Sequence, residues 1–157
     1  MALEANMPMQ DKVAPADGGV VNSISENMDE VARYWIEEAD EALTILQHLF
    51  EKGDYSYALF FGHLAVEKLM KAAYVLKNKE HAPPIHNLPR LARAAGVWLS
   101  PERREQLVRI TSFNIEARYP DLKRSFRYKC TREFTAEQID GIQDVMKWLR
   151  KTTTLKK

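Results

Sequence analysis

The apolar residues from Met28 onward follow the period of an α-helix. Steps of three or four separate the buried positions expected for the first helix, which are Val31, Trp35, Ala39, Ala42, Leu46 and Leu49. Acidic residues fill the positions between them, so one face is apolar and the other is charged. Gly53 ends this helix, because glycine readily adopts the left-handed conformation that closes helices, and Asp54 is the expected cap of the next helix.

The second predicted helix, from about residue 55 to residue 77, is apolar almost all round, which is typical of a helix in the centre of a bundle. Its polar residues His63, Glu67 and Lys71 are four apart and therefore share one side, with Glu67 well placed to pair with Lys71. Two interpretations remain open. This side is either partly exposed and forms ordinary helical pairs, or it lines a pocket or a subunit interface.

Proline, glycine and capping residues divide the rest of the chain. Asn87 is the expected N-cap of a short helix that ends before Gly96. A longer helix is predicted from Ser100 to the residue before Pro120, because proline disfavours helical geometry at the residue that precedes it. The capping-box pattern of residues 135–138 is predicted to open the last helix. The sequence therefore predicts an all-α fold, an up-and-down antiparallel bundle of about five helices.

Composition adds limits to this picture. The 157 residues fit one domain, predicted over 27–152, with a disordered N-terminal tail at 1–26 and a C-terminal tail at 153–157. A net charge of +1 gives no global attraction to nucleic acid or membrane, so any electrostatic site must be local. One cysteine, Cys130, excludes an internal disulfide, and neither a secretory leader nor a membrane-spanning run is recognised. We expect a cytoplasmic protein without membrane contact.

The familiar motifs of catalysis and cofactor binding are absent from the sequence. It contains no glycine-rich phosphate loop, CxxC, HExxH or GxSxG. His81 and His86 are five residues apart, but Pro83 and Pro84 lie between them, so the pair cannot share a helical face. They are better interpreted as residues of a solvent-facing loop than as metal ligands. We therefore expect no metal site and no cofactor, and we assign no catalytic residue.

A basic segment follows the helix that ends before Pro120. Its cationic residues are Arg118, Lys123, Arg124, Arg127, Lys129 and Arg132. Tyr119, Phe126 and Tyr128 are interleaved with them, a mixture that suits a nucleotide or RNA surface because cations neutralise phosphates and aromatic rings stack on bases. The alternative is a solvated connector whose aromatic residues pack inward. Arg118 itself lies in the last helical turn, where the helix dipole favours a positive charge.

Four blocks of this sequence resemble the HEPN domain (higher eukaryotes and prokaryotes nucleotide-binding), over roughly residues 31–152. The blocks are YWIEEADEAL at 34–43, YSYALFFGHLAVEKLMKAAYV at 55–75, PPIHNLPRLARAAG at 83–96 and IEARYPD at 115–121. The chain is most similar to a small, standalone bacterial and archaeal branch whose genes often neighbour those of minimal nucleotidyltransferases. The resemblance implies a helical bundle that forms a homodimer, with its site in a cleft between protomers.

Many members of this family are RNases or toxins with an RxxxxH-type motif, in which histidine handles the 2′-hydroxyl proton and arginine steadies the phosphate. This sequence departs from that motif. Residues 123–125, counted on from Arg118, contain no histidine, and the only arginine that precedes any histidine, Arg33, lies too far back. Whether the protein is an enzyme therefore stays open, and the sequence favours a protein that is not one.

Without the RxxxxH-type motif, the resemblance still implies a ligand-binding role. The predicted ligand-binding residues are Asn114, Arg118 and Asp121 near the RYPD block, His63 and Lys71 on the central helix, and His86 in the PPIHN loop. Arg118 and Lys71 are expected to hold phosphate, His63 or His86 to contact a base or ribose, and Asp121 to orient Arg118.

Three functions are compatible with these residues. The first is a nucleotide- or RNA-binding module that works with a nucleotidyltransferase-like partner in a toxin–antitoxin-like context. The second is a metal-independent RNase toxin with a non-standard site that uses His63 or His86. The third is a purely structural interaction protein, for which the basic segment is incidental.

Overall fold

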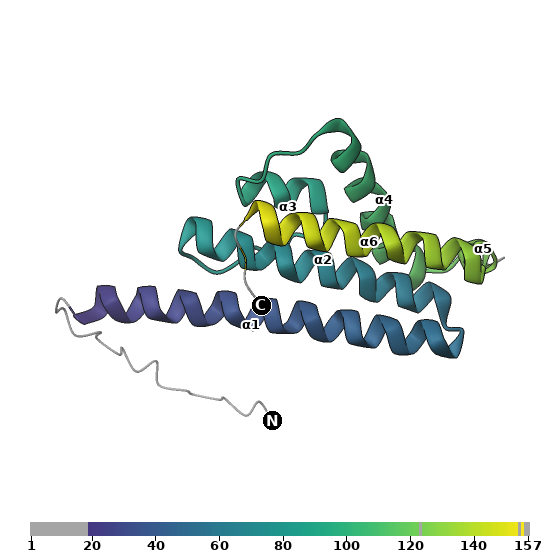
Figure 1. Cartoon of the computed structure of the whole chain (residues 1–157), viewed down its shortest axis with the longest axis horizontal. Helices are drawn as coiled ribbons and strands as arrows, with labels where there is room; N and C mark the ends of the chain where they lie inside the picture. Colours follow the sequence, from purple (N-terminus) through teal and green to yellow (C-terminus); the bar gives the residue numbers. More distant parts are fainter. Residues whose placement is uncertain (1–18, 123, 154, 156–157) are drawn as a thin grey trace, which may run out of the picture.

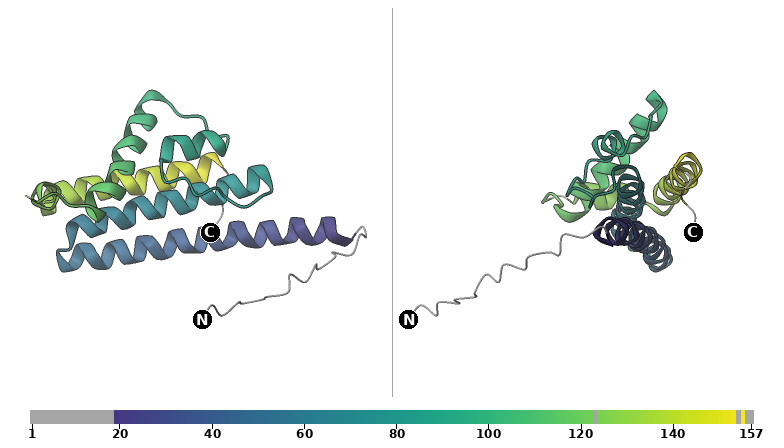
Figure 2. Two further views of the ribbon diagram at one scale, coloured as in Figure 1. Left: turned by 180° about the vertical axis from the view of Figure 1, so that it is seen from behind. Right: turned by 90° about the vertical axis from the view of Figure 1, so that its left-hand side faces the viewer.

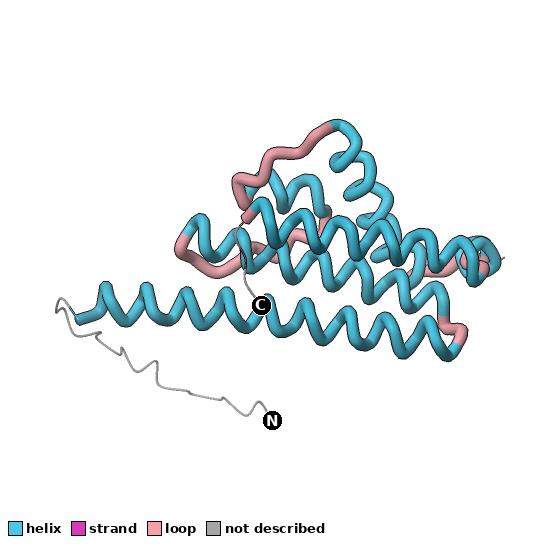
Figure 3. The backbone as a smooth tube through the Cα atoms, viewed as in Figure 1, coloured by secondary structure: helices cyan, strands magenta, loops and turns pink. Residues whose placement is uncertain are grey.

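The computed structural model describes residues 19–122, 124–153 and 155, with side chains from residue 27 onward. This part of the chain contains helices and loops but no strand (Figures 1 and 3). Its six helices are α1 (Gly19–Lys52), α2 (Tyr55–Asn78), α3 (Leu88–Ala94), α4 (Pro101–Arg118), α5 (Ser125–Lys129) and α6 (Arg132–Thr152). The predicted all-α fold is confirmed. The bundle has one helix more than expected because α5 forms inside the predicted basic connector.

Helix α2 occupies the centre of the bundle, as its apolar surface predicts. Helix α1 runs antiparallel along one side of it, and α3, α4 and α6 cover other sides (Figures 1 and 2). At Gly62 the neighbouring helices pack closely, because a Cβ atom there would collide with the end of the Ile142 side chain from α6 and would also crowd Leu46 from α1. The absence of a side chain at Gly62 thus lets three helices meet.

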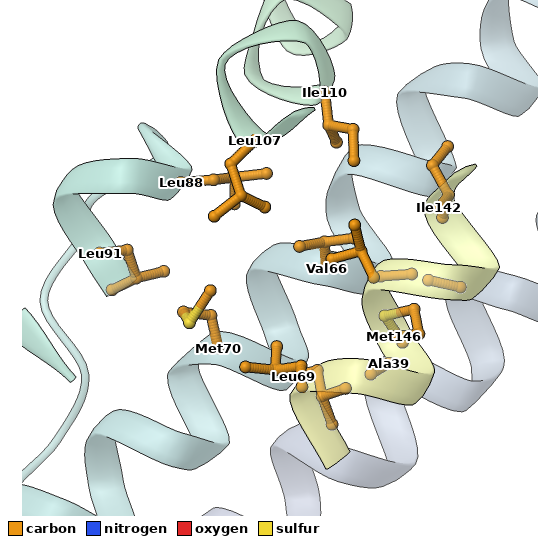
Figure 4. Packing of buried hydrophobic residues seen from close by; sticks show 14 of the residues in the cluster. Ala39, Val66, Leu69, Met70, Leu88, Leu91, Leu107, Ile110, Ile142 and Met146 are labelled. Carbon is orange, nitrogen blue, oxygen red and sulfur yellow. The ribbon is translucent and has the colours of Figure 1, made fainter. Parts of the chain in front are cut away.

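The hydrophobic core is built from the inward faces of five helices. Figure 4 shows Val66 and Met70 of α2 among side chains from the helices around them. The labelled neighbours are Ala39 of α1, Leu88 and Leu91 of α3, Leu107 and Ile110 of α4, and Ile142 and Met146 of α6. These residues carry the i, i+3, i+4 spacing from which the helices were predicted, so the same pattern that defines each helix also places it.

Most of the predicted helix ends are confirmed. The side chain of Asn87 accepts a hydrogen bond from the backbone N–H three residues on, at 2.9 Å, and caps α3. Ser100 caps α4 in the same way at 3.1 Å, and that helix ends before Pro120. Gly53 and Gly96 have φ angles of +83° and +71°, the left-handed conformation expected where a helix closes.

Two capping predictions are wrong. Asp54 precedes α2 but its side chain makes no capping hydrogen bond, because its ψ angle of 65° lies outside the extended region in which an N-cap side chain reaches the first turn. Helix α6 begins one turn earlier than the capping box predicts, and Thr131 caps it through the N–H of Phe134 at 3.1 Å. Thr135 is therefore inside the helix, where its side chain is buried.

Described structure continues beyond residues 27–152 at both ends, and the predicted domain bounds themselves stay a prediction. Helix α1 begins at Gly19, within the segment expected to be a tail; residues 20–52 contain neither glycine nor proline, so nothing in that run interrupts a helix. Residues 1–18, the rest of that segment, lie outside the described residues. At the other end Leu155 is buried, 6% exposed, and its N–H donates to the carbonyl of Arg150 at 3.0 Å. Across the described residues, no helix has both the length and the apolar character that a bilayer crossing requires.

Candidate functional site

Glu67 of α2 is the centre of a buried polar cluster. Its carboxylate accepts a hydrogen bond from Nδ1 of His86 at 2.7 Å and lies 3.3 Å from Nζ of Lys71. His63, one turn earlier on α2, has its Nε2 atom 3.9 Å from the same carboxylate. The residues that share one side of α2 in the sequence therefore do meet, and His86 joins them from the loop between α2 and α3.

His63 fastens that loop to the central helix. Its Nε2–H donates to the backbone carbonyl of His86 at 2.9 Å, and the side chain is fully buried. Burial lowers the pKa of His63 below its ordinary value of 6.5, while the hydrogen bond to His86 and the charge of Glu67 act in the opposite direction. His63 is thus neutral near pH 7. Its Nδ1 atom is buried and has no hydrogen-bond partner within the described residues.

Lys71 is also occupied by contacts within the protein. It is 8% exposed, pairs with Glu67, and its ammonium group lies 5.0 Å from the ring centroid of Trp35 on α1. His86 differs from Lys71 and His63, because 56% of its side chain is exposed. Since Nδ1 donates to the carboxylate, Nε2 of a neutral His86 carries the lone pair and is the ring atom available to a ligand.

Arg118, in the last turn of α4, is exposed but fixed in place. Its guanidinium donates to Oδ1 of Asn114 at 3.2 Å and to the hydroxyl of Tyr119 at 3.2 Å, and it lies 5.2 Å from the centroid of the Tyr119 ring. Asn114 is 5% exposed and lies one turn before Arg118 on the same side of the helix, and its part in a ligand site stays a prediction. Two anchors thus hold the guanidinium at the surface.

Asp121 holds the beginning of α5 in place through hydrogen bonds. Its carboxylate accepts hydrogen bonds from the backbone N–H and the hydroxyl of Ser125, both at 2.8 Å, where α5 begins. Arg124 has a φ angle of +53°, so the chain turns sharply between these two residues. Lys123, one of the predicted basic residues, lies outside the described residues. The role expected for Asp121, to orient Arg118, stays a prediction, and Ser125 is one observed partner of its carboxylate.

The turn between α4 and α5 borders a hollow of about 240 Å³. The residues that line it are Glu116, Tyr119, Asp121, Ser125, Phe126 and Lys129. Tyr119 and Tyr128 are 65% and 77% exposed, whereas Phe126 packs on Phe113 with ring centroids 5.9 Å apart. The two tyrosines therefore do not follow the interpretation in which the aromatic residues of this segment pack inward, and Phe126 does.

The predicted site residues thus form two groups. Among the described residues, Arg118 contacts Asn114 on α4 and Tyr119 directly after that helix. Glu67 contacts the loop and its own helix, and Lys71 links this group to Trp35 on α1. Asn114, on the buried face of α4, is the predicted residue that lies toward α2, since these two helices pack together. Within the described residues, no hydrogen bond or ion pair joins the two groups.

Sequence reasoning missed two residues of the buried cluster. Glu67 was recognised as the partner of Lys71 but was left out of the predicted set, although the carboxylate proves to link all the others. Trp35 follows the apolar period of α1 and gave no further signal. Cys130 offers no nucleophile, because burial raises the pKa of its thiol to about 11. The described residues contain no group of side chains arranged to hold a metal ion.

Comparison with known proteins shows which family this chain belongs to. The HEPN domain model matches residues 32–152, which is well over half of the chain. Comparisons with curated proteins and with solved structures gave no match. The matched range runs from Ala32, within α1, to the end of α6 and includes both groups of site residues. The chain belongs to the HEPN domain family.

Proposed function

We propose that this protein is a cytoplasmic nucleotide- or RNA-binding module that acts as a homodimer. The observation that carries the proposal is the exposed guanidinium of Arg118, which Asn114 and Tyr119 hold in place beside an exposed basic and aromatic segment. A fixed cation binds a phosphate with less loss of conformational entropy than a mobile one. The negative end of the α4 dipole adds to the stability of the charge at that position.

The surroundings of Arg118 support the same class of ligand. The exposed cations of the segment, besides Arg118, are Arg124, Arg127, Lys129 and Arg132. Tyr119 and Tyr128 expose rings on which a base can stack. A chain of net charge +1 thus concentrates positive charge at one end of α4, which gives a local electrostatic site without global attraction to nucleic acid.

A nucleotidyltransferase-like partner and a toxin–antitoxin-like context complete the proposal. Both rest on the similarity of the sequence blocks to the family branch described above. Co-expression of this protein with a minimal nucleotidyltransferase, followed by co-purification, tests the first of them. Separate elution of the two proteins at micromolar concentration would count against the paired function and leave nucleotide binding to be judged by itself.

Arg118→Ala tests the binding function directly. We expect it to weaken binding of a labelled oligouridine at low salt about tenfold or more, because a charged hydrogen-bond donor to phosphate is lost. It should also reduce the slope of log affinity against log salt by about one. Fluorescence anisotropy titrations at several salt concentrations measure both quantities.

Arg90→Ala is the matched control, since Arg90 is an exposed arginine of α3 outside the α4–α5 turn. It should leave affinity and slope unchanged. Equal affinities for the wild type and the Arg118 variant would contradict the assignment of Arg118, and the absence of any binding by oligouridine or ATP at low salt would overturn the proposed function itself.

A second candidate function is metal-independent RNA cleavage, which the contact between His86 and Glu67 favours. The carboxylate fixes the ring so that Nε2 of His86 faces outward as a base. In this reaction Nε2 takes the proton of a ribose 2′-hydroxyl, and the freed oxygen attacks the adjacent phosphorus. The P–O5′ bond breaks, water protonates the 5′-oxygen, and a 2′,3′-cyclic phosphate remains.

The two functions are separated by incubating RNA with the protein in the presence of a chelator. Cleavage that disappears in His86→Gln and weakens in Glu67→Gln would support catalysis, whereas His48→Gln serves as the control because His48 is an exposed histidine on α1. RNA that stays intact with the wild type removes this second function and leaves the binding function in place.

A further inference from the structure

Trp98 stands between two hollows on the surface, one of about 500 Å³ and the other of about 370 Å³, and both include the turn of residues 96–98. The Trp98 side chain is 78% exposed. Trp35 and Trp148, in contrast, are partly buried against the core. An indole ring carries a large apolar surface, so a tryptophan left in water at the edge of two hollows is a candidate contact for a ligand.

The local backbone fixes the direction of this side chain. Gly96, with its positive φ angle, closes α3, and the N–H of Val97 donates to the carbonyl of Ala92 at 2.9 Å. Val97 is buried at 8% exposure and holds the turn against the core, so the next side chain, Trp98, projects outward. Ser100 then caps α4. The exposed tryptophan is therefore held between two fixed helix ends.

Three cations surround the tryptophan. Lys77 lines the larger hollow, and Arg93 and Arg104 line the smaller one. Within the described residues no aspartate or glutamate lines either hollow, and the three side chains have no ion-pair or hydrogen-bond partner. The hollow beside Arg118 differs, since Glu116 and Asp121 contribute to its lining.

We propose that Trp98 is the stacking platform of a second site for a nucleotide unit, with Arg93 and Arg104 as its phosphate contacts. A planar base has the shape to lie on the indole face, and the two guanidinium groups supply the charge that a phosphate requires. Lys77 contributes a further cation in the larger hollow. This inference rests on the proposed function, and it places a ligand contact where none of the predicted site residues lies.

The position of the hollow on α4 indicates how the two sites relate. Arg104 is in the first turn of α4 and Arg118 in the last, 14 positions further along the chain. At about 1.5 Å per residue they are about 20 Å apart along the helix. That separation corresponds to several nucleotides of one strand. A single RNA strand that reaches both sites would bind more tightly than a free nucleotide, which can occupy only one.

The test compares variants of the full-length protein in titrations with three probes, namely a labelled 12-mer of oligouridine, UMP, and an acidic peptide of glutamate residues. We expect Trp98→Ala to weaken oligouridine binding about tenfold, because loss of one stacked base has an effect of that order. Trp98→Phe should restore most of the affinity. Tyr34→Ala, which removes an exposed ring from α1, is the matched control and should have no effect.

The outcomes separate this inference from the proposed function. If Arg118→Ala weakens oligouridine binding and Trp98→Ala does not, the Trp98 site is overturned and the proposed function stands. If the reverse holds, the Trp98 site stands and Arg118 loses its assignment. Binding of UMP that depends on Trp98 shows a site for free nucleotide, whereas dependence seen only with oligouridine shows a site for RNA. Binding of the acidic peptide alone would overturn the inference in favour of a protein partner.

Discussion

At the scale of single residues, burial and a hydrogen bond together determine the protonation state of His63. Its Nε2–H holds the carbonyl of His86, which requires a proton on that nitrogen and leaves the buried Nδ1 without one. Adding a second proton would place a positive charge in the core beside Lys71. Glu67 offsets part of that cost, but burial is the largest effect on the pKa.

This arrangement predicts a loss of stability in mild acid. The unfolded chain takes up a proton at His63 near pH 6.5, whereas the folded chain does so only at a lower pH, so the free energy of unfolding falls as the pH drops through this window. Urea denaturation between pH 7.5 and pH 5.5 measures the slope of the free energy of unfolding against pH. His63→Gln should reduce this slope, and His48→Gln should leave it unchanged. The charged and titratable groups that face His63 are Glu67, His86 and Lys71, and an equal slope in the His63 variant would contradict this account.

Only part of this chemistry could be predicted from the sequence. The spacing of His63, Glu67 and Lys71 places them on one side of α2, and the structure confirms that they are neighbours. The link to His86 could not be predicted from spacing, because it depends on how the loop after α2 folds back over the helix. The exposure of Trp98 could not be predicted either, because it depends on the burial of its neighbour Val97 in the core.

At the scale of helices, the junction of α1, α2 and α6 at Gly62 makes a specific prediction. Gly62→Ala should lower the free energy of unfolding by about 1–2 kcal/mol, because crowding of Ile142 and Leu46 outweighs the gain of about 1 kcal/mol in helix propensity. Ile142→Val removes the methyl group that collides. In that background Gly62→Ala should be neutral or stabilising, so the two substitutions are coupled. Chemical denaturation of the four proteins measures the coupling, and simple additivity would contradict this account.

The helices were predicted well where one residue type decides the outcome. Pro120 had to end α4, and Gly53 and Gly96 had to close the helices before them. Capping was less certain because several residues compete for the role. Thr131 and Thr135 both have a suitable side chain, and α6 begins at the earlier of the two. Helix α5 was missed because five residues are too few to show a helical period.

At the scale of the whole molecule, α4 carries apolar side chains on the face that points away from the core. Val108, Ile115 and Tyr119 are 55%, 56% and 65% exposed, and Leu122 beyond the helix is fully exposed. Val108 and Ile115 are seven residues apart and so lie on the same side. Such a stripe on one protomer leaves room for a second copy, which agrees with the proposed homodimer and with a site between protomers.

Ile115→Glu should therefore weaken self-association about 100-fold, since it would bury a charge at the proposed interface. Light scattering after gel filtration, over a range of protein concentrations, measures the change from dimer to monomer. Tyr34→Glu adds the same charge at an exposed aromatic position on α1 and should keep the dimer. A wild-type protein that stays monomeric at all concentrations would contradict the prediction.

The helical bundle could be predicted from the sequence, because the apolar surface of α2 and the amphipathic faces of the helices around it are strong signals. The geometry of the candidate site could not be predicted, because its two groups of residues depend on contacts between segments far apart in the chain. Arg118 illustrates the limit. The sequence placed it at a helix end, but its anchors, the Asn114 side chain and the Tyr119 hydroxyl, became visible only in three dimensions.

The contacts that attach the loop between α2 and α3 to the rest of the protein also limit how that loop can move. Two hydrogen bonds from α2 end on His86, because the Glu67 carboxylate accepts from its imidazole and the His63 ring donates to its backbone carbonyl. The hydroxyl of Tyr74, also on α2, holds the earlier part of the loop at the Glu80 side chain. A ligand that draws the imidazole of His86 away from its carboxylate therefore removes one of the two links beside α3 and leaves the start of the loop attached. Amide hydrogen exchange should then rise near His86 and stay unchanged near Glu80.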